Sequence, residues 1–473
     1  MSTFSNPSRP REGAPEVHEL RHSHSLILGG GLAGALLALL LAQRGLQVHV
    51  LERRADPRRA AQERGRSINL ALAARGIDAL EFAGLMPAIQ PLLMPMRGRH
   101  LHEADGSQHF LSYGQRPEEE IYAISRHALN CALLDAAAAH PGVTLSFGQR
   151  CVEIEPAHGT VAFEDMGHGT IRREQADVVL ACDGAGSVAR RTMVDRGLCE
   201  AREEWLPHGY IELTIPADAE GRHRLAADAL HIWPRGGYML IALPNPDGSF
   251  TCTLFLPYDA DPGFTQLREA AAVETFFRAR FPDTLALMPE LVPEFLANPV
   301  GRLGTVRTRP WHAEGRLLLL GDAAHPIVPF HGQGMNCAFE DCRDLARLID
   351  AHGADWPTLL PAFEALRRPS AEAIADMALE NYVEMRDTVR DPRFALKKAL
   401  AFELERAFPA QFIPRYSMVM FHPEISYAEA QRRGARQDVL LEELTAGCQS
   451  LEEIDLAQAR RRAQEQFARP SGA

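Results

Sequence analysis

The residues with the clearest capacity for chemistry lie in one stretch, 321–336, which has the sequence GDAAHPIVPFHGQGMN. Four leucines before it, at 317–320, predict a buried strand that ends at Asp322. A proline-rich loop follows, and two glycines, the second of them Gly334, lead into a predicted helix that begins near Met335. Glycines let the backbone approach a flat ligand, and a helix N-terminus presents free N–H groups and a positive dipole end. This arrangement suits a cofactor that carries hydroxyl groups and becomes negative on reduction, as a flavin does. An ordinary strand–loop–helix connection is the alternative.

The second motif is the pattern G-x-G-x-x-G near the start of the chain, formed by Gly29, Gly31 and Gly34. A strand is predicted at 25–28, an Ala- and Leu-rich helix follows the glycines, and a second strand at 48–51 ends in Glu52. In a dinucleotide-binding fold the first glycine permits the tight turn, the second admits the pyrophosphate and the third lets helix and strand pack. The acid accepts from a ribose hydroxyl. The motif predicts a bound dinucleotide without distinguishing FAD from NAD, and Glu52 disfavours NADP at this ribose.

A further strand, predicted at 177–181, also ends in an acid followed by glycine, at Asp183. Two strand-end acids favour a cofactor that lies across several strand termini, as ligands do in open α/β sheets. Basic residues at 64–66 either contact a pyrophosphate or form a solvated charge cluster.

Polar residues at strand and helix spacing predict a second part of the site. A strand expected at 95–102 would place Arg97 and Arg99 on one face, where they are either solvated or, in a pocket, able to clamp a carboxylate. A helix would bring three residues at positions i, i+3 and i+4 to one face, namely Asn381, Glu384 and Met385.

Composition excludes several other classes of protein. The net charge of −12 and the pI of about 5.9 argue against nucleic acid or an anionic membrane as partner. The eight cysteines form no C-x-x-C pair, so we expect no metal site, and scattered thiols suit a reducing cytoplasm. The apolar stretch at 26–41 predicts a strand–turn–helix unit and not a signal peptide, and we expect no transmembrane span.

We predict an α/β protein with a Rossmann-like dinucleotide-binding domain, a mostly antiparallel β-sheet substrate domain and a helical C-terminal region. The expected parts are a disordered lead-in at 1–22, the dinucleotide-binding domain at 23–200 with 96–113 contributing to the substrate pocket, the substrate domain at 201–301, a return to the first domain at 302–368 and the helical region at 369–473. Helices are expected at 340–352, 356–366, 369–388, 393–406 and 424–467, the last broken near Gly434 and Gly447.

The G-x-G-x-x-G with its distal acid, the internal Asp-Gly and the late GDAAH…GQGMN occur here in the order that is typical of class A flavoprotein monooxygenases. The chain resembles that family over about residues 24–425. The motifs RSINLAL, PMRGR, PHGYIELTIP, HIWPR, MLIALPN, SFTCTLF and NYVEMR are similar to those of members that hydroxylate L-kynurenine. The resemblance implies bound FAD, NADPH as a transient co-substrate, and conversion of L-kynurenine and O₂ to 3-hydroxy-L-kynurenine through a flavin C4a-hydroperoxide.

The resemblance also implies which residues contact each ligand. Beside the motif residues Gly29, Gly31, Gly34, Asp183 and Gly334, the FAD contacts implied are Ala33, Leu51, Glu52, Arg53, Arg54, Ala71, Arg126, Cys151, Val188, Asp322, Met335 and Asn336. Arg99 would hold the substrate carboxylate with help from Tyr113. The remaining pocket residues implied are Asn381, Glu384, Met385 and Tyr416 at its polar end and Ile241, Leu243, Phe255, Phe330 and His331 around the ring.

Some alternatives stay open on the residues alone. His331 is either structural or an acid–base group, and Gly186 departs from the aromatic residue found in many members of the family. Animal members carry a C-terminal membrane anchor, whereas the charged, helical tail at 424–467 predicts a soluble enzyme of bacterial type without one. We also expect a cytoplasmic protein that is a monomer or a homodimer. A hydroxylase of another aromatic acid, an NAD-dependent dehydrogenase and a non-catalytic nucleotide-binding protein are the competing functions.

Overall fold

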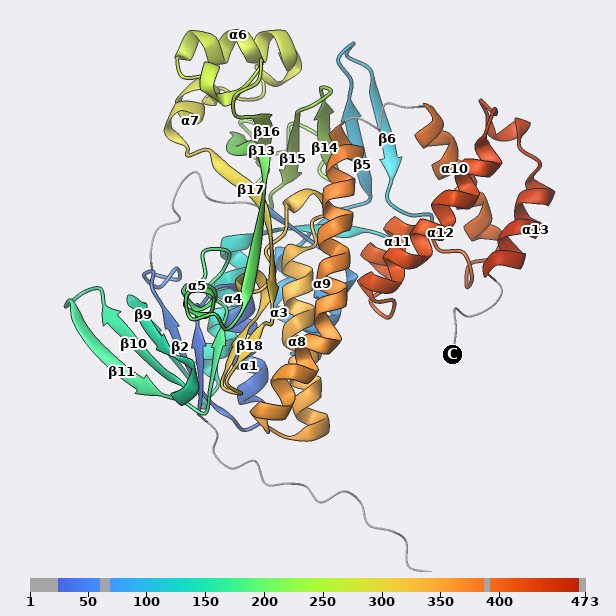
Figure 1. Cartoon of the computed structure of the whole chain (residues 1–473). Coiled ribbons are helices and arrows are strands. Elements are labelled where there is room, and N and C mark those ends of the chain that lie inside the picture. The colour runs from blue at the N-terminus through green and yellow to red at the C-terminus, as the bar shows by residue number, and fades with distance from the viewer. Residues whose placement is uncertain (1–23, 60–68, 387–391, 468–473) are drawn as a thin grey trace, which may run out of the picture.

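The computed structural model describes residues 24–59, 69–386 and 392–467. The predictions of a disordered lead-in at 1–22 and of a pyrophosphate contact at 64–66 lie outside the described residues. Figure 1 shows an α/β body, a second sheet capped by helices at one end, and a group of C-terminal helices at one side.

A six-stranded sheet forms the first layer and contains the predicted strands of the glycine motif. Its order is β18 (His312–Ala313), β19 (Leu317–Leu319), β12 (Val178–Ala181), β1 (His24–Leu28), β2 (Gln47–Glu52) and β8 (Val143–Phe147). All neighbours are parallel except β18 and β19. The central strands are apolar runs because a parallel sheet is covered on both faces. The helices α1 (Leu32–Ala42) and α4 (Arg126–Ala139) pack against its strands. The other helices of this part of the chain are α2 (Ala74–Phe82), α3 (Met86–Ile89) and α5 (Val188–Asp195).

A seven-stranded sheet forms the second layer and is antiparallel except for one pair, as predicted for a mostly antiparallel sheet. Its order is β17 (Gly301–Arg309), β13 (Glu200–Ile215), β16 (Phe250–Pro257), β15 (Met239–Pro244), β14 (Ala229–Pro234), β5 (Gly98–His102) and β6 (Gln108–Ser112). The parallel pair is β14 with β5, which brings an early segment of the chain into this sheet. The helices α6 (Ala270–Arg280) and α7 (Leu291–Ala297) share an apolar core with its strands.

Two three-stranded sheets complete the β structure. One joins β3 (Asn69–Leu72), β7 (Ile121–Ser125) and β4 (Met94–Met96), and the other joins β11 (Thr170–Gln175), β10 (Thr160–Asp165) and β9 (Gln149–Glu155). The prediction that Arg97 and Arg99 share one strand face is wrong. The chain turns between β4 and β5, which belong to different sheets, so the Arg97 side chain is 69% exposed and that of Arg99 only 13%.

The C-terminal part is helical as predicted, with two corrections. Its helices are α8 (Gly334–His352), α9 (Trp356–Arg386), α10 (Pro392–Ala407), α11 (Arg415–Phe421), α12 (Tyr427–Thr445) and α13 (Leu456–Phe467). The helices predicted at 356–366 and 369–388 are one helix, which continues through Pro361 and Pro369 because a long buried face holds it against α8 and α12. Gly434 lies inside α12, where a Cβ would be 2.3 Å from Arg415 Cδ, so it permits close packing and does not break the helix.

None of the helices that the structure describes is both long and apolar enough to cross a membrane.

A buried ion network joins α8 to α9 beneath the GDAAH loop. Arg367 on α9 donates to Asp341 at 2.8 Å, to Glu340 at 2.7 Å and to Asp344 at 3.1 Å, and Arg367, Glu340 and Asp341 are each under 5% exposed. The other oxygen of Asp341 lies 2.7 Å from His325 Nε2. Burial raises the pKa of Asp341, but His325 and Arg367 together hold it below its usual range. The network therefore fixes the loop that follows β19 to the two central helices.

We predict that Arg367→Met lowers the free energy of unfolding by about 3–5 kcal/mol, because it removes a cation that three buried carboxylates share. The matched control is Arg368→Met. Arg368 is partly exposed and pairs at 3.4 Å with Glu364, so its loss should cost under about 1 kcal/mol. Thermal unfolding measures the difference, and equal midpoints for the two variants would contradict the role of the network.

Candidate active site

A cavity of about 550 Å³ lies where the two large sheets meet. The predicted cofactor residues that line it are Gly31, Ala33, Ala71, Arg126, Asp322, Gly334 and Met335. The predicted substrate residues that line it are Arg99, Tyr113, Ile241, Leu243, Phe255, Phe330, His331, Met385 and Tyr416. The structure thus brings part of each predicted set to one cavity, although these residues come from segments that are far apart in the sequence.

The three glycines of the first motif differ in their surroundings. Gly29 has a φ of +100°, and a Cβ there would lie 2.5 Å from the carbonyl oxygen of Cys182. A Cβ on Gly34 would lie 1.9 Å from the carbonyl oxygen of Gly29, so this glycine lets α1 pack on β1. A Cβ on Gly31 would meet no atom within 4 Å, because it would point into the open cavity. Gly31 also begins α1 without a capping side chain, which leaves the first N–H groups of the helix free for an anion.

Glu52 ends β2 beside this turn and is 5% exposed. Its carboxylate accepts from the Gly30 backbone N–H at 2.8 Å and from Arg54 Nε at 2.8 Å. Burial raises the pKa of Glu52, but the hydrogen bonds and charge of Arg54 outweigh this and keep it below its usual range. An ionised acceptor thus lies beside the glycine turn. Leu51 is buried, and the neighbouring Arg53 is exposed.

The Asp183 carboxylate accepts hydrogen bonds from the protein backbone, which the sequence did not predict. One carboxylate oxygen accepts from the backbone N–H groups of Val188 at 2.6 Å and Ala189 at 3.3 Å, at the start of α5. Burial raises the pKa of Asp183. The two residues that follow it, Gly184 and Ala185, line the cavity in its place.

Cys151, on β9, does not line the cavity. Burial, with a smaller contribution from Asp183, raises the pKa of its thiol to about 12, so the thiol is neutral and unreactive.

Asn336 holds the second glycine loop in position. Its side chain donates to the carbonyl oxygens of Ala71 at 2.8 Å and Gly332 at 2.9 Å, and it accepts from the Ala73 N–H at 2.9 Å. These bonds tie the start of α8 to β3, so the side chain has a structural task and any ligand contact must come from the backbone. Asp322 is exposed toward the cavity at the end of β19.

Arg99 is a buried cation that lacks a close anionic partner. Its nearest carboxylate in the described part of the chain is Glu384, at 4.0 Å, and its Nε has no hydrogen-bond partner there. The guanidinium carbon lies 5.6 Å and 5.1 Å from the ring centres of Tyr113 and Tyr416. Burial raises the pKa of both tyrosines, so they stay neutral hydrogen-bond donors. Buried charges are normally paired, and this one is therefore poised for an anionic ligand.

A second cavity of about 190 Å³ adjoins the first and shares with it Arg99, Tyr113, His331 and Tyr416. Two predicted residues on α9, Asn381 and Glu384, line this cavity. Asn381 donates to the carbonyl oxygen of Phe330 at 2.6 Å and so positions the loop that carries Phe330 and His331.

Aromatic rings form an apolar part of the wall of the first cavity. Phe255 and Phe330 have ring centres 4.9 Å apart, and Phe330 stacks on Tyr382 at 4.1 Å. His331 stacks on Tyr416, and burial lowers its pKa to about 3. His331 is therefore a neutral, buried ring near pH 7, which favours its structural role over acid–base work.

Several cavity residues were not predicted as site residues. Those on the strands of the second sheet are Trp205, Tyr210, Met239, Thr253 and Arg302, and Lys398 on α10 lines the second cavity. Tyr210, Met239 and Thr253 lie within the motifs PHGYIELTIP, MLIALPN and SFTCTLF, whereas the other three belong to no motif, and strand or helix periodicity gives only their face.

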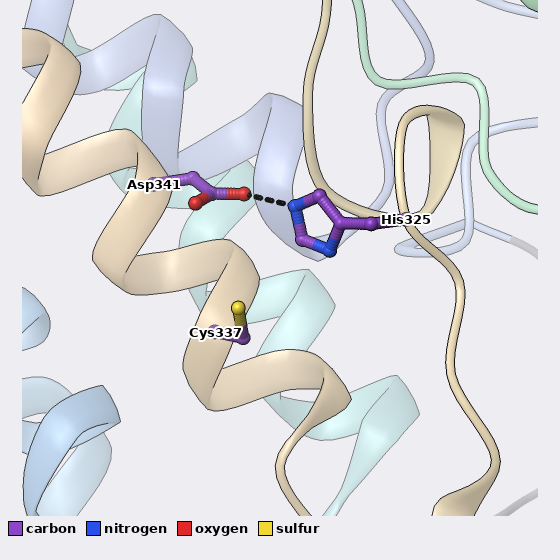
Figure 2. A group of neighbouring side chains, drawn as sticks. All are labelled: His325, Cys337 and Asp341. Atoms are coloured by element: carbon purple, nitrogen blue, oxygen red, sulfur yellow. Dashed lines mark hydrogen bonds and ion pairs between the residues drawn. The ribbon is translucent and has the colours of Figure 1, made fainter. Parts of the chain in front are cut away.

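His325, Cys337 and Asp341 place one potential metal ligand each within 4.8 Å of one another (Figure 2). Arg367 lies 2.8 Å from Asp341 and 3.7 Å from Cys337 Sγ, so a guanidinium already supplies the positive charge. Burial also raises the pKa of the Cys337 thiol, which disfavours the thiolate that a metal needs. The group is explained by the ion network.

Comparison with known proteins agrees with this geometry. A family model described as an FAD binding domain matches residues 22–378, which defines the class as an FAD-binding flavoprotein. The kynurenine 3-monooxygenase of Myxococcus xanthus is 46% identical over 443 residues and covers 94% of this chain and 95% of that protein. That of Stenotrophomonas maltophilia is also 46% identical, over 91% of this chain and 94% of that protein. The chain belongs to the kynurenine 3-monooxygenase family.

Solved structures show the same fold at low identity. A tetrameric 2-methyl-3-hydroxypyridine-5-carboxylic acid oxygenase matches with a TM-score of 0.65 and 21% identity, over 79% of this chain and 95% of that one. A probable FAD-dependent monooxygenase from Pseudomonas aeruginosa matches with a TM-score of 0.61 and 20% identity, over 78% and 97%. The predictions of the fold class and of FAD are confirmed, and the dehydrogenase alternative is not supported.

The residues present fit FAD. The open space at Gly31 accommodates a pyrophosphate against the N-terminus of α1, and Glu52 provides an acceptor beside it. A second helix N-terminus, at Gly334, lines the same cavity and has no capping side chain.

We predict that Gly31→Val leaves the fold intact and raises the dissociation constant of FAD roughly ten- to a hundredfold, because the side chain fills cofactor space. Gly31 has an extended backbone that valine adopts without strain. Gly34→Val is the contrasting variant, and it should lower the stability of the FAD-free protein as well. FAD titration and thermal unfolding of the FAD-free proteins separate the two effects. Full FAD affinity in Gly31→Val would contradict the placement of the cofactor.

Proposed function

We propose that this chain hydroxylates L-kynurenine at ring position 3, consuming NADPH and O₂ and releasing 3-hydroxy-L-kynurenine, NADP⁺ and water. The observation that carries the proposal is the buried, incompletely paired Arg99 in a cavity that also reaches the glycine motif. The names of the relatives support the substrate.

Arg99 and Glu384 have the charges that an α-amino acid requires. The substrate is a zwitterion, and its carboxylate and ammonium groups each need an opposite charge. At 4.0 Å, Arg99 NH1 and Glu384 Oε1 are too far apart to use up each other's hydrogen-bonding capacity. In this proposal Arg99 and the two tyrosine hydroxyls hold the carboxylate, and Glu384 holds the ammonium group.

The apolar wall positions the aromatic ring and excludes water. Phe255, Phe330 and Ile241 surround the place where an aniline ring would lie, and the burial of the two phenylalanines keeps the site dry. FAD, when bound, supplies the activated oxygen for the ring. An aniline ring is electron-rich and needs no strong base, which agrees with the lowered pKa of about 3 at His331. The protein's contribution is therefore orientation and desolvation.

We place the protein in the cytoplasm because its eight cysteines are free and scattered, as in a reducing compartment. A monomeric or homodimeric state and the domain boundaries remain predictions from the sequence.

The direct test is the absorption spectrum of the purified protein, followed by NADPH oxidation with and without L-kynurenine. We expect a flavin spectrum, a sharp rise in NADPH oxidation with L-kynurenine, and 3-hydroxy-L-kynurenine as product. A flavin spectrum without this response would refute kynurenine as substrate and direct the assay to other aromatic acids. A protein that neither contains nor takes up FAD would refute the class of reaction.

We predict that Arg99→Met raises the KM for L-kynurenine roughly a hundredfold or more, because a charged partner of the carboxylate is lost. FAD content should not change, since Arg99 belongs to the substrate side. Arg97→Met is the matched control. Arg97 lies two residues before Arg99 and its side chain is 69% exposed, so this variant should leave the KM for L-kynurenine unchanged. Loss of FAD in Arg99→Met, or an equal effect in Arg97→Met, would contradict this role.

A further inference from the structure

The second cavity lies among the C-terminal helices and adjoins the first cavity at Arg99. Residues of α9, α10, α11 and α12 and the end of β6 line it. Figure 1 shows the group of helices α10–α13 beside the edge strand β6. The cavity opens onto the first one through the residues they share, so a ligand held at Arg99 faces both.

Two of the four cations that line this cavity, Lys397 and Arg415, are neutralised by carboxylates. Lys397 pairs with Glu442, and Arg415 pairs with Glu380 at 2.7 Å and with Asp438 at 3.6 Å. Neither of these two cations is therefore left without a carboxylate partner.

Lys398 differs from its neighbours. Its ammonium donates to the carbonyl oxygen of Ser112 at 3.0 Å and lies 5.4 Å from the ring centre of Phe402. Among the residues that the structure describes, no carboxylate lies within 4.0 Å of it. Two acids line the described wall of this cavity, and Asp438 is paired with Arg415. Arg99 and Lys398 therefore share the remaining acid, Glu384, so that two positive charges face one carboxylate. Such a site favours an anion.

We propose that Lys398 is a second binding group for the substrate carboxylate, which it holds together with Arg99. The inference rests on the proposed function. The amino-acid end of L-kynurenine is joined to the ring through a ketone and a methylene, so a ring in the first cavity directs the carboxylate toward the junction with the second. Arg99 and Lys398 then share the carboxylate, and Glu384 accepts from the ammonium group.

A purely structural role for Lys398 is the competing explanation, because its bond to Ser112 also tethers α10 to β6. Kynuramine separates the two roles, since it has the ring, ketone and amino group of kynurenine and lacks the carboxylate. A carboxylate-binding lysine affects only kynurenine, whereas a tether affects both ligands alike.

The first experiment measures the dissociation constants of L-kynurenine and kynuramine for the FAD-loaded protein, from the change in the flavin spectrum. We expect Lys398→Met to weaken kynurenine binding roughly tenfold and to leave kynuramine binding unchanged. Lys397→Met is the matched control, because that ammonium is already paired with Glu442, and it should change neither constant. Equal weakening of both ligands, or no change in their ratio, would overturn the proposal.

The second experiment uses pH. Burial, with a smaller contribution from the charge of Arg99, lowers the pKa of Lys398 to about 8, while Glu384 opposes the shift. The wild-type preference for kynurenine over kynuramine should therefore be full below pH 8 and decline as pH rises above it. Lys398→Arg stays charged and should keep its preference.

The other charged groups near this ammonium are Arg99 on β5, Glu384 on α9, the Arg415–Asp438 pair of α11 and α12, and Lys397 with Glu442. These groups, and the amino group of each ligand, are the same for the wild type and for Lys398→Arg. A difference between the pH profiles of the two proteins therefore reports the titration of Lys398. Parallel profiles would overturn the proposal. Hydroxylation by the wild type is a separate measurement, so failure of the proposed function is distinguishable from failure of this inference.

Discussion

The buried ion network around Arg367 is the interaction on which the site depends. Arg367 holds three carboxylates of α8, and Asp341 extends the network to His325 in the loop after β19. That loop continues to the residues that line the cavity. Charges buried in this way stabilise only when every partner is present, so the network specifies one arrangement of loop and helices.

The cavity is a product of two sheets and not of one domain alone. The parallel sheet contributes strand ends, tight glycine turns and helix N-termini, which suit a phosphate-bearing cofactor. The antiparallel sheet contributes the apolar wall through Ile241 and Phe255. β5 carries Arg99 into the second sheet by its parallel pairing with β14. One arginine thereby stands where the cofactor side, the apolar wall and the C-terminal helices meet.

Charged groups at this junction are incompletely paired within the described residues. Arg99, Lys398 and Glu384 come from β5, α10 and α9, and no two of them form a close ion pair. Burial lowers the pKa of Lys398 and raises that of Glu384, because the charges near each group only partly offset its lost solvation. A ligand with one carboxylate and one ammonium group would supply the missing partners. Neutral groups, including His331 and both tyrosines, fill the rest of the junction.

Much of the cofactor side followed from the sequence, because its signals are local. A glycine needed for a positive φ or a close approach, an acid at a strand end and an apolar run before a turn all act within a few residues, as at Gly29, Glu52 and Asp322. The helical character of the C-terminal part and the antiparallel sheet also followed from periodicity. The resemblance to a family, and not spacing, supplied the substrate residues.

Tertiary structure decided what depends on distant neighbours. Arg97 and Arg99 are equivalent in the sequence, and only the turn between two sheets sends one to solvent and the other to the cavity. Packing also lets α9 continue through two prolines. The side chains of Asn336 and Asp183 form hydrogen bonds with backbone groups of the protein. Lys398 is distinguished from Lys397 because no carboxylate of the described residues lies within 4.0 Å of its ammonium group, and no local sequence pattern encodes that difference. Burial and pairing are properties of the folded chain, because they depend on which segments the fold brings together.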